Sequence, residues 1–171
     1  MIEITQVRTP EQIRDVTAML HEYLAWAFTL ESHSDDAPTF EALDEELATL
    51  PGIYVPPAGR LLLATSDGET AGCIALKPVD ATTGELKRFY VRPEFRGRKI
   101  GPQLVAALVE AARAAGYQKV ILDSHFSMTT AHAIYAAAGF RTVSAPPGFP
   151  AALVPIVVFM ELTVREAPAG E

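Results

Sequence analysis

The chain has 171 residues, of which 49% are hydrophobic and 20% are charged. This length fits one domain that buries roughly 70% of its unfolded surface, and the composition excludes a disordered or fibrous chain. A formal net charge of −7 argues against general nucleic-acid binding, which needs a positively charged surface. We therefore expect no nucleic-acid partner, and an acidic protein suits cationic partners better.

The first third of the chain predicts one strand and two helices. The strand covers 2–8, and a helix over 10–28 follows it, with apolar residues recurring on one face. A polar loop separates this helix from a short one over 40–50. The longest apolar stretches, such as 154–160, are far shorter than the ~20 residues that span a bilayer, and the N-terminus does not read as a signal peptide. We expect no membrane association and a cytoplasmic location.

The middle of the chain predicts a run of antiparallel strands. They cover 60–66, 71–79 and 81–91, and the sequence DGET at 67–70 reads as a tight hairpin turn between the first two. The single cysteine, Cys73, excludes an internal disulfide and a multi-cysteine zinc site, and in the run AGCIAL we expect it to be a small core residue.

Helices and strands alternate after residue 100. The expected helices are 102–116 and 129–139, each ended by a glycine, and the expected strands are 119–124, 140–144 and 153–164. Antiparallel strands followed by strand-helix-strand units predict an α/β domain with a mixed sheet and helices on its faces. We expect a single domain over 1–165 and a flexible C-terminal tail over 166–171.

The segment RGRKIGPQ, residues 96–103, lies between the strand over 81–91 and the following helix. Gly97 and Gly101 leave room for a sharp turn or a close ligand, and a helix that begins at Gly101 or Pro102 points unpaired N–H groups at the same place. Together with the cations Arg96, Arg98 and Lys99, this arrangement suits a diphosphate. Neither a Walker loop nor the dinucleotide fingerprint is present. On spacing alone, a plain basic turn remains an equal alternative.

The longer stretch ELKRFYVRPEFRGRKIG resembles the acyl-CoA signature of the GNAT N-acetyltransferase superfamily. That signature has Arg or Gln, two residues, Gly, one residue, then Gly or Ala, and the matching positions here are Arg96, Lys99 and Gly101. The downstream runs AARAAGYQKVILDS and AHAIYAAAGFRTV are similar to the family's next strand and helix. The resemblance covers about 64–143 and implies a mixed, mostly antiparallel central sheet, flanked by helices, with a V-shaped opening between the central strands.

The resemblance also implies a reaction, the transfer of an acetyl group from acetyl-CoA to a primary amine by direct attack in a ternary complex. Glu85 is the candidate that takes the proton of the amine, and Tyr135 is the candidate that protonates the departing thiolate. Backbone N–H groups in 89–91 would stabilise the oxyanion. The residues expected to bind acetyl-CoA are Phe89, Tyr90, Val91, Arg96, Gly97, Arg98, Lys99, Ile100, Gly101, Pro102 and Tyr135.

The acceptor is less well defined by the sequence. Trp26, Phe28 and Phe149 fall in segments that line the acceptor cleft in relatives, although aromatic residues at helical spacing are usually core. His125 and His132 flank the site, but the four histidines of the chain show no metal-ligand spacing, so we expect polar contacts and no metal. A small amine, an amino acid, an antibiotic and a protein N-terminus all stay open as acceptors, as does a homodimer.

Three departures from the family pattern motivate an alternative function. Lys99 stands where the family usually has glycine, Pro102 lacks one backbone donor, and Met128 stands where an asparagine often begins the helix that bears the tyrosine. A non-catalytic acyl-CoA-binding regulatory module is therefore the second hypothesis, and an anion-binding domain without coenzyme A is the third.

Overall fold

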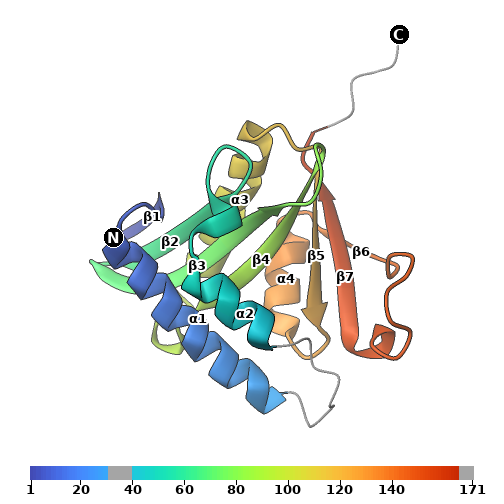
Figure 1. Cartoon of the computed structure of the whole chain (residues 1–171), viewed down its shortest axis with the longest axis horizontal. Helices are drawn as coiled ribbons and strands as arrows, with labels where there is room; N and C mark the ends of the chain where they lie inside the picture. The colour runs from blue at the N-terminus through green and yellow to red at the C-terminus, as the bar shows by residue number, and fades with distance from the viewer. Residues whose placement is uncertain (31–39, 166–171) are drawn as a thin grey trace.

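The computed structural model describes residues 1–30 and 40–165, so the expected tail 166–171 lies outside the described residues. One seven-stranded sheet has the order β1-β2-β3-β4-β5-β7-β6, and helices flank it (Figure 1). Among the described strands only β4 and β5 pair in parallel, and the other neighbours are antiparallel. This arrangement confirms the predicted α/β fold with a mixed, mostly antiparallel sheet.

The elements follow the predicted order along the chain. Their bounds are β1 Ile2–Gln6, α1 Pro10–Leu30, α2 Phe40–Ala48, β2 Arg60–Ser66, β3 Glu69–Pro78, β4 Thr83–Val91, α3 Ile100–Ala114, β5 Lys119–His125, α4 Thr129–Ala137, β6 Arg141–Val143 and β7 Val157–Thr163.

The predicted boundaries agree with these bounds to within two residues, with one exception at the start of the last strand. The helix expected from residue 102 begins two residues earlier, at Ile100. The strand expected from residue 153 begins only at Val157, because Val154–Ile156, with Pro155 in its middle, forms a 3-10 turn. The predicted hairpin turn is confirmed by positive φ angles at Asp67 and Gly68, which such a turn requires.

The sheet is covered on both faces, and the alternation of side chains along β3 shows how. Cys73 and Ala75 belong to the cluster beneath α1 and α2, whereas Ile74 and Leu76 belong to the cluster beneath α3 and α4. A strand with helices on both sides is apolar throughout, which is why the run AGCIAL has no polar side chain in it. No helix in the described parts of the chain is long and apolar enough to cross a membrane.

The parallel pair at the centre of the sheet separates partway along its length. β4 and β5 pair at Thr83–Lys119, Gly84–Val120 and Glu85–Ile121. Beyond Glu85 the two strands continue without pairing, and they diverge in Figure 1. This separation is the V-shaped opening that the family resemblance implied.

β4 also contains a bulge just beyond the point of separation. Its register against β3 shifts between Cys73–Tyr90 and Ala75–Lys87, so one extra residue of β4 is accommodated there. Arg88 lies within the shift and has a φ of +57°, a left-handed conformation that is uncommon for a residue with a side chain.

Candidate active site

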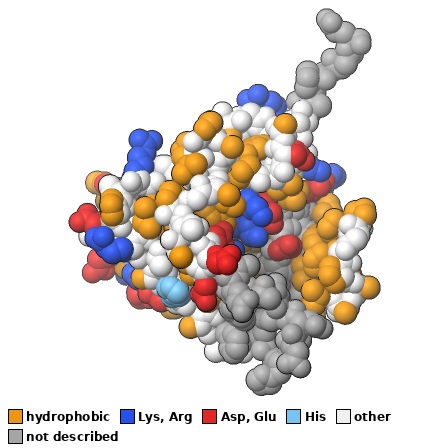
Figure 2. Space-filling view, in the orientation of Figure 1, with side chains coloured by type: hydrophobic (Ala, Val, Ile, Leu, Met, Phe, Trp, Pro, Cys, Tyr) orange, Lys and Arg blue, Asp and Glu red, His pale blue; other side chains and the backbone are white. Residues whose placement is uncertain are grey.

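A cavity of about 1040 Å³ lies at the opening of the sheet. Its wall includes residues of α1, α2, β4, β5 and α4 and the segment 149–157 that precedes and begins β7. Figure 2 shows the surface hollowed here, with acidic and basic side chains in the hollow and apolar side chains along one side. Five of the residues singled out in the sequence line this cavity, namely Phe89, His125, Met128, Tyr135 and Phe149.

The chain turns sharply just before α3 begins. Gly97 has a φ of +79° and Lys99 a φ of +63°, so the chain makes two left-handed turns just before the helix begins. The N–H groups of Ile100 and Gly101 are in the first turn of α3 and have no intrahelical acceptor. Lys99 therefore adopts a left-handed conformation, which glycine adopts without steric cost.

The two arginines of this loop lie against aromatic rings. Arg96 donates from Nε to the carbonyl oxygen of Val91 at 3.0 Å, and its guanidinium carbon is 5.7 Å from the centre of the Trp26 ring. The guanidinium carbon of Arg98 is 5.2 Å from the centre of the Phe95 ring. Trp26, expected near the acceptor, thus contacts the basic loop and is not among the described residues that line the cavity.

The two glycines of the loop have different roles. Among the described residues other than its two chain neighbours, no heavy atom lies within 4 Å of the position that a Cβ on Gly97 would occupy, so its positive φ explains the glycine. A Cβ on Gly101 would lie 3.0 Å from Cδ1 of Ile134 and 3.2 Å from Cζ of Phe89. Gly101 therefore lets α3 pack closely against α4 and β4. The sequence had suggested a sharp turn or close approach to a ligand as its reason.

Tyr135 is buried in the wall of the cavity. Only 5% of it is exposed, and its ring lies 5.6 Å from that of Phe89 and 5.9 Å from that of Phe140, measured between centroids. Burial, together with a smaller effect of Tyr23, raises the pKa of the Tyr135 hydroxyl above its ordinary value. The phenol is therefore protonated at physiological pH and has a proton to donate.

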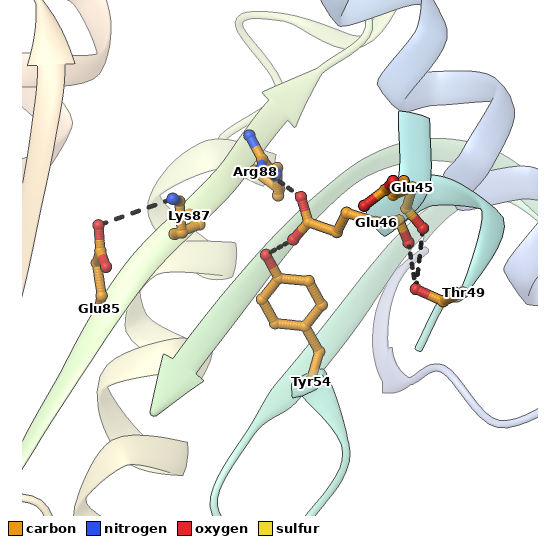
Figure 3. A network of polar contacts seen from close by, with 7 residues as sticks. All are labelled: Glu45, Glu46, Thr49, Tyr54, Glu85, Lys87 and Arg88. Carbon is orange, nitrogen blue, oxygen red and sulfur yellow. Dashed lines mark hydrogen bonds and ion pairs between the residues drawn. The ribbon is translucent and has the colours of Figure 1, made fainter. Parts of the chain in front are cut away.

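Glu85 lies at the apex of the opening, because it forms the last pair between β4 and β5. Its carboxylate is 3.9 Å from Nζ of Lys87, and its side chain is 17% exposed (Figure 3). Lys87 lines the cavity, whereas Glu85 is next to the lining residues and not among them. The candidate base is thus close to a lining residue but is not itself part of the cavity lining.

The remaining candidates divide between polar contacts and core. His132 Nε2 lies 2.9 Å from Oγ of Ser124, and burial, with a smaller contribution from His125, lowers its pKa. His125 lines the cavity, and its Nδ1 is 2.7 Å from Oγ of Ser127. Cys73 is fully buried and its pKa is raised by burial to about 12, which confirms it as a core residue.

Two further results concern the expected acceptor residues and metal ligands. Phe149 lines the cavity and makes an edge contact with Phe159, with 4.8 Å between ring centroids. The side chain of Phe28 lies outside the described residues. Within residues 1–30 and 40–165, no three His, Cys, Asp or Glu side chains are grouped so as to hold a metal ion.

The sequence did not indicate a polar cluster in the cavity wall formed by Glu46, Tyr54 and Arg88. The Glu46 carboxylate accepts one hydrogen bond from the Tyr54 hydroxyl and one from the Arg88 guanidinium (Figure 3). Burial of Tyr54, followed by its hydrogen bond to Glu46, raises the pKa of the Tyr54 hydroxyl. The three residues come from α2, a 3-10 turn and β4, so no local motif could have joined them.

The fold and this site define a class of protein. The acetyltransferase (GNAT) family matches residues 17–140, and the chain belongs to that family. It is therefore an acetyltransferase, as the motifs at the start of α3 predicted.

Known proteins agree with this assignment. An uncharacterized N-acetyltransferase of Schizosaccharomyces pombe is 34% identical over 167 residues, which cover 96% of each chain. An N-acetyltransferase of Thermoplasma acidophilum, solved in complex with coenzyme A, superposes with a TM-score of 0.75 at 20% identity, over 95% of this chain and 99% of that one. An acetyltransferase of Streptococcus agalactiae superposes with a TM-score of 0.74 at 19% identity, over 95% and 98%. The structural likenesses confirm the fold.

Proposed function

We propose that this acetyltransferase transfers an acetyl group from acetyl-CoA to a primary amine, by direct attack within a ternary complex. The observation that carries the proposal is the separation of β4 from β5 beyond Glu85, beside both the start of α3 and the large cavity. The separation leaves part of one edge of β4 without a strand partner, so that a thioester chain can lie between the strands. The Thermoplasma acidophilum relative, which was solved with coenzyme A, supports this cosubstrate.

The start of α3 is the proposed site for the diphosphate of acetyl-CoA. The free N–H groups of Ile100 and Gly101, the partial positive charge of the helix and the nearby cations of Arg98 and Lys99 all favour an anion there. Pro102, the third residue of the helix, has no N–H, so the first turn offers one donor fewer than usual.

Glu85 is proposed to accept the proton that the amine must lose before it attacks. An alkylamine with a pKa near that of lysine, about 10.4, is almost wholly protonated at neutral pH and has no free electron pair. Loss of the proton to Glu85, directly or through water, allows the nitrogen to form a bond to the thioester carbonyl carbon. Backbone N–H groups in 89–91 are proposed to stabilise the resulting oxyanion.

Tyr135 is proposed to protonate the leaving sulfur. When the tetrahedral intermediate collapses, the carbon–sulfur bond breaks and the electron pair remains on sulfur. The departing thiolate needs a proton, since its conjugate acid has a pKa at or above that of cysteine, about 8.5. Tyr135 is proposed to donate this proton as the bond breaks, and the tyrosinate regains one through solvent as the attacking nitrogen loses its extra proton. The products are an N-acetylamine and the free thiol of coenzyme A.

The cavity wall supports an acceptor with a charged head and an apolar body. The segment 145–158 contains no charged residue, and Phe149 and Leu153 from it line the cavity. Glu45 and Asp123 contribute carboxylates to other parts of the lining, which also contains basic side chains. A cationic amine group is attracted to the carboxylates, while an aliphatic or aromatic substituent gains by lying against the apolar segment.

The test is to incubate the protein with acetyl-CoA and a series of linear alkylamines of matched pKa, and to measure free thiol and acetylated product. We expect kcat/KM to rise about fourfold for each methylene group that becomes buried. Initial-velocity lines should intersect, because both substrates are bound before either product leaves. Binding of acetyl-CoA without thiol release from any amine would favour the non-catalytic regulatory module.

A further inference from the structure

Several unfavourable features coincide at Arg88, in the wall of the cavity. Its φ of +57° is disfavoured for any residue with a Cβ, and it interrupts the regular pairing of β4 with β3. Its charged side chain is only 20% exposed, and its Nε is buried without a hydrogen-bond partner among the described residues. Such features are found together where function requires a specific local shape.

Arg88 is held at both its side chain and its backbone. The guanidinium is bound by Glu46 of α2, and the other carboxylate oxygen of Glu46 accepts from Tyr54, which is 1% exposed (Figure 3). At the backbone, the thiol of Cys73 donates to the carbonyl oxygen of Arg88 with the sulfur at 3.4 Å. These contacts hold the residue in a conformation that it would otherwise avoid.

The bulge lies where the proposed chemistry needs an accurate backbone. β4 has already parted from β5 at Glu85, and the residue after Arg88 is Phe89, whose ring contacts Tyr135. The direction of the N–H groups in 89–91 depends on the φ and ψ angles of Arg88, because these angles set the course of the chain that follows. Donors for an oxyanion must be aimed before the reaction begins.

We propose that Glu46, Tyr54 and Arg88 are positioning residues that hold the β4 bulge in the shape required for acetyl transfer. They act on the reaction through the backbone of 89–91, which they connect to α2. Glu45, the residue before Glu46 in α2, lines the cavity. This inference rests on the proposed function. The competing explanation is that Glu46, a carboxylate in the same wall, itself accepts the proton of the amine.

A double-mutant cycle separates the two explanations, because glycine adopts a positive φ without a side chain to hold it. Glu46→Gln should lower kcat roughly 10- to 100-fold, the scale of a small misplacement of reacting groups, and change the KM for acetyl-CoA less than twofold. Arg88→Gly should keep more activity than Arg88→Ala. In the Arg88→Gly background, Glu46→Gln should have almost no further effect on kcat. Glycine at position 88 adopts the positive φ by itself, so Glu46 is no longer needed to hold it.

Other outcomes overturn the inference. A Glu46→Gln loss of equal size in both backgrounds would identify Glu46 as a direct participant. Unchanged kcat in folded Glu46→Gln protein, with only a lower melting temperature, would leave the cluster a merely structural role. Glu161→Gln is the matched control, because it removes an ion pair of comparable type to Arg141, at 2.8 Å, outside the cavity lining; its kcat should not change.

A second measurement does not depend on turnover. Hydrogen exchange of the backbone amides of 86–91 should become faster in Glu46→Gln and in Tyr54→Phe, while exchange in the paired segment 83–85 stays the same. Unchanged exchange across 86–91 would show that the cluster does not hold the bulge. If the wild-type protein releases no thiol with any amine, the proposed function fails; if it is active and only the cycle fails, the positioning role alone is rejected.

Discussion

The two halves of the candidate site are built in different ways. The half proposed to bind acetyl-CoA comes mainly from one continuous stretch, 89–102, together with Tyr135. The half proposed to take the acceptor combines Glu45, Asp123 and the segment 149–157, which the fold brings together from widely separated parts of the sequence. A continuous segment carries its shape in its own glycines and charges, whereas a surface assembled from distant parts exists only after folding. The comparison predicts that substitutions in the two halves will impair different steps of the reaction.

The largest effect is expected at Tyr135, where the two halves meet. Tyr135→Phe keeps the ring between Phe89 and Phe140 and removes only the hydroxyl. We expect kcat to fall by about 10²- to 10⁴-fold, as is typical of losing a general acid, with little change in the affinity for acetyl-CoA. Steady-state kinetics and calorimetry with acetyl-CoA measure the two quantities, and a fall in affinity alone would show that Tyr135 serves only to pack the cavity wall.

The next effect is expected at Glu85, on the acceptor side of the reaction. Glu85→Gln should lower kcat about 10²-fold near pH 7 if the carboxylate takes the proton of the amine. The loss should shrink as the pH approaches the pKa of the amine, about 10.4 for an alkylamine, because the neutral amine then forms without help. A pH–rate profile of both proteins is the measurement. A loss of constant size across the pH range would instead mean that Glu85 orients the acceptor.

Most of the fold could be predicted because its patterns are local. The alternation of strands and helices, the turn at 67–70 and the glycines at 116 and 139 that follow α3 and α4 with positive φ all agree with the structure. The strand expected from residue 153 was too long, because an apolar run does not by itself separate a strand from the turn around Pro155.

The candidate site could be predicted only in part. Lys99 was identified as a departure from the family pattern, but its left-handed conformation is fixed by the loop around it and cannot be read from its side chain. Gly101 was explained by a sharp turn or a close ligand, while the structure shows Ile134 and Phe89 against it, a contact between elements that the sequence does not pair. The Glu46–Arg88 ion pair joins residues 42 positions apart and had no sequence signal.

A ligand comparison tests the acetyl-CoA half by itself. If the start of α3 binds the diphosphate, acetyl-CoA at about 100 times its Kd should stabilise the protein by about 2.7 kcal/mol. For a domain of this size that corresponds to a rise in Tm of roughly 5–10 °C. Acetyl-pantetheine, which lacks the phosphates, should give a much smaller shift at the same concentration in a thermal melt. Equal shifts would mean that the basic loop does not contact the cosubstrate.

The smallest effect on stability is expected at Lys99. Its direction depends on whether the new residue tolerates the positive φ at this position. Because Lys99 has a φ of +63°, Lys99→Gly should leave the stability within about 1 kcal/mol of wild type and preserve most of the affinity for acetyl-CoA. Lys99→Val removes the same charge but places a β-branched residue in a left-handed conformation, which should cost about 1–2 kcal/mol. Denaturant unfolding of both variants isolates the backbone effect, since they share the loss of charge. If the two variants are equally stable and bind acetyl-CoA equally, the loop does not require a left-handed residue at this position, and the resemblance of Lys99 to the family's glycine has no functional meaning.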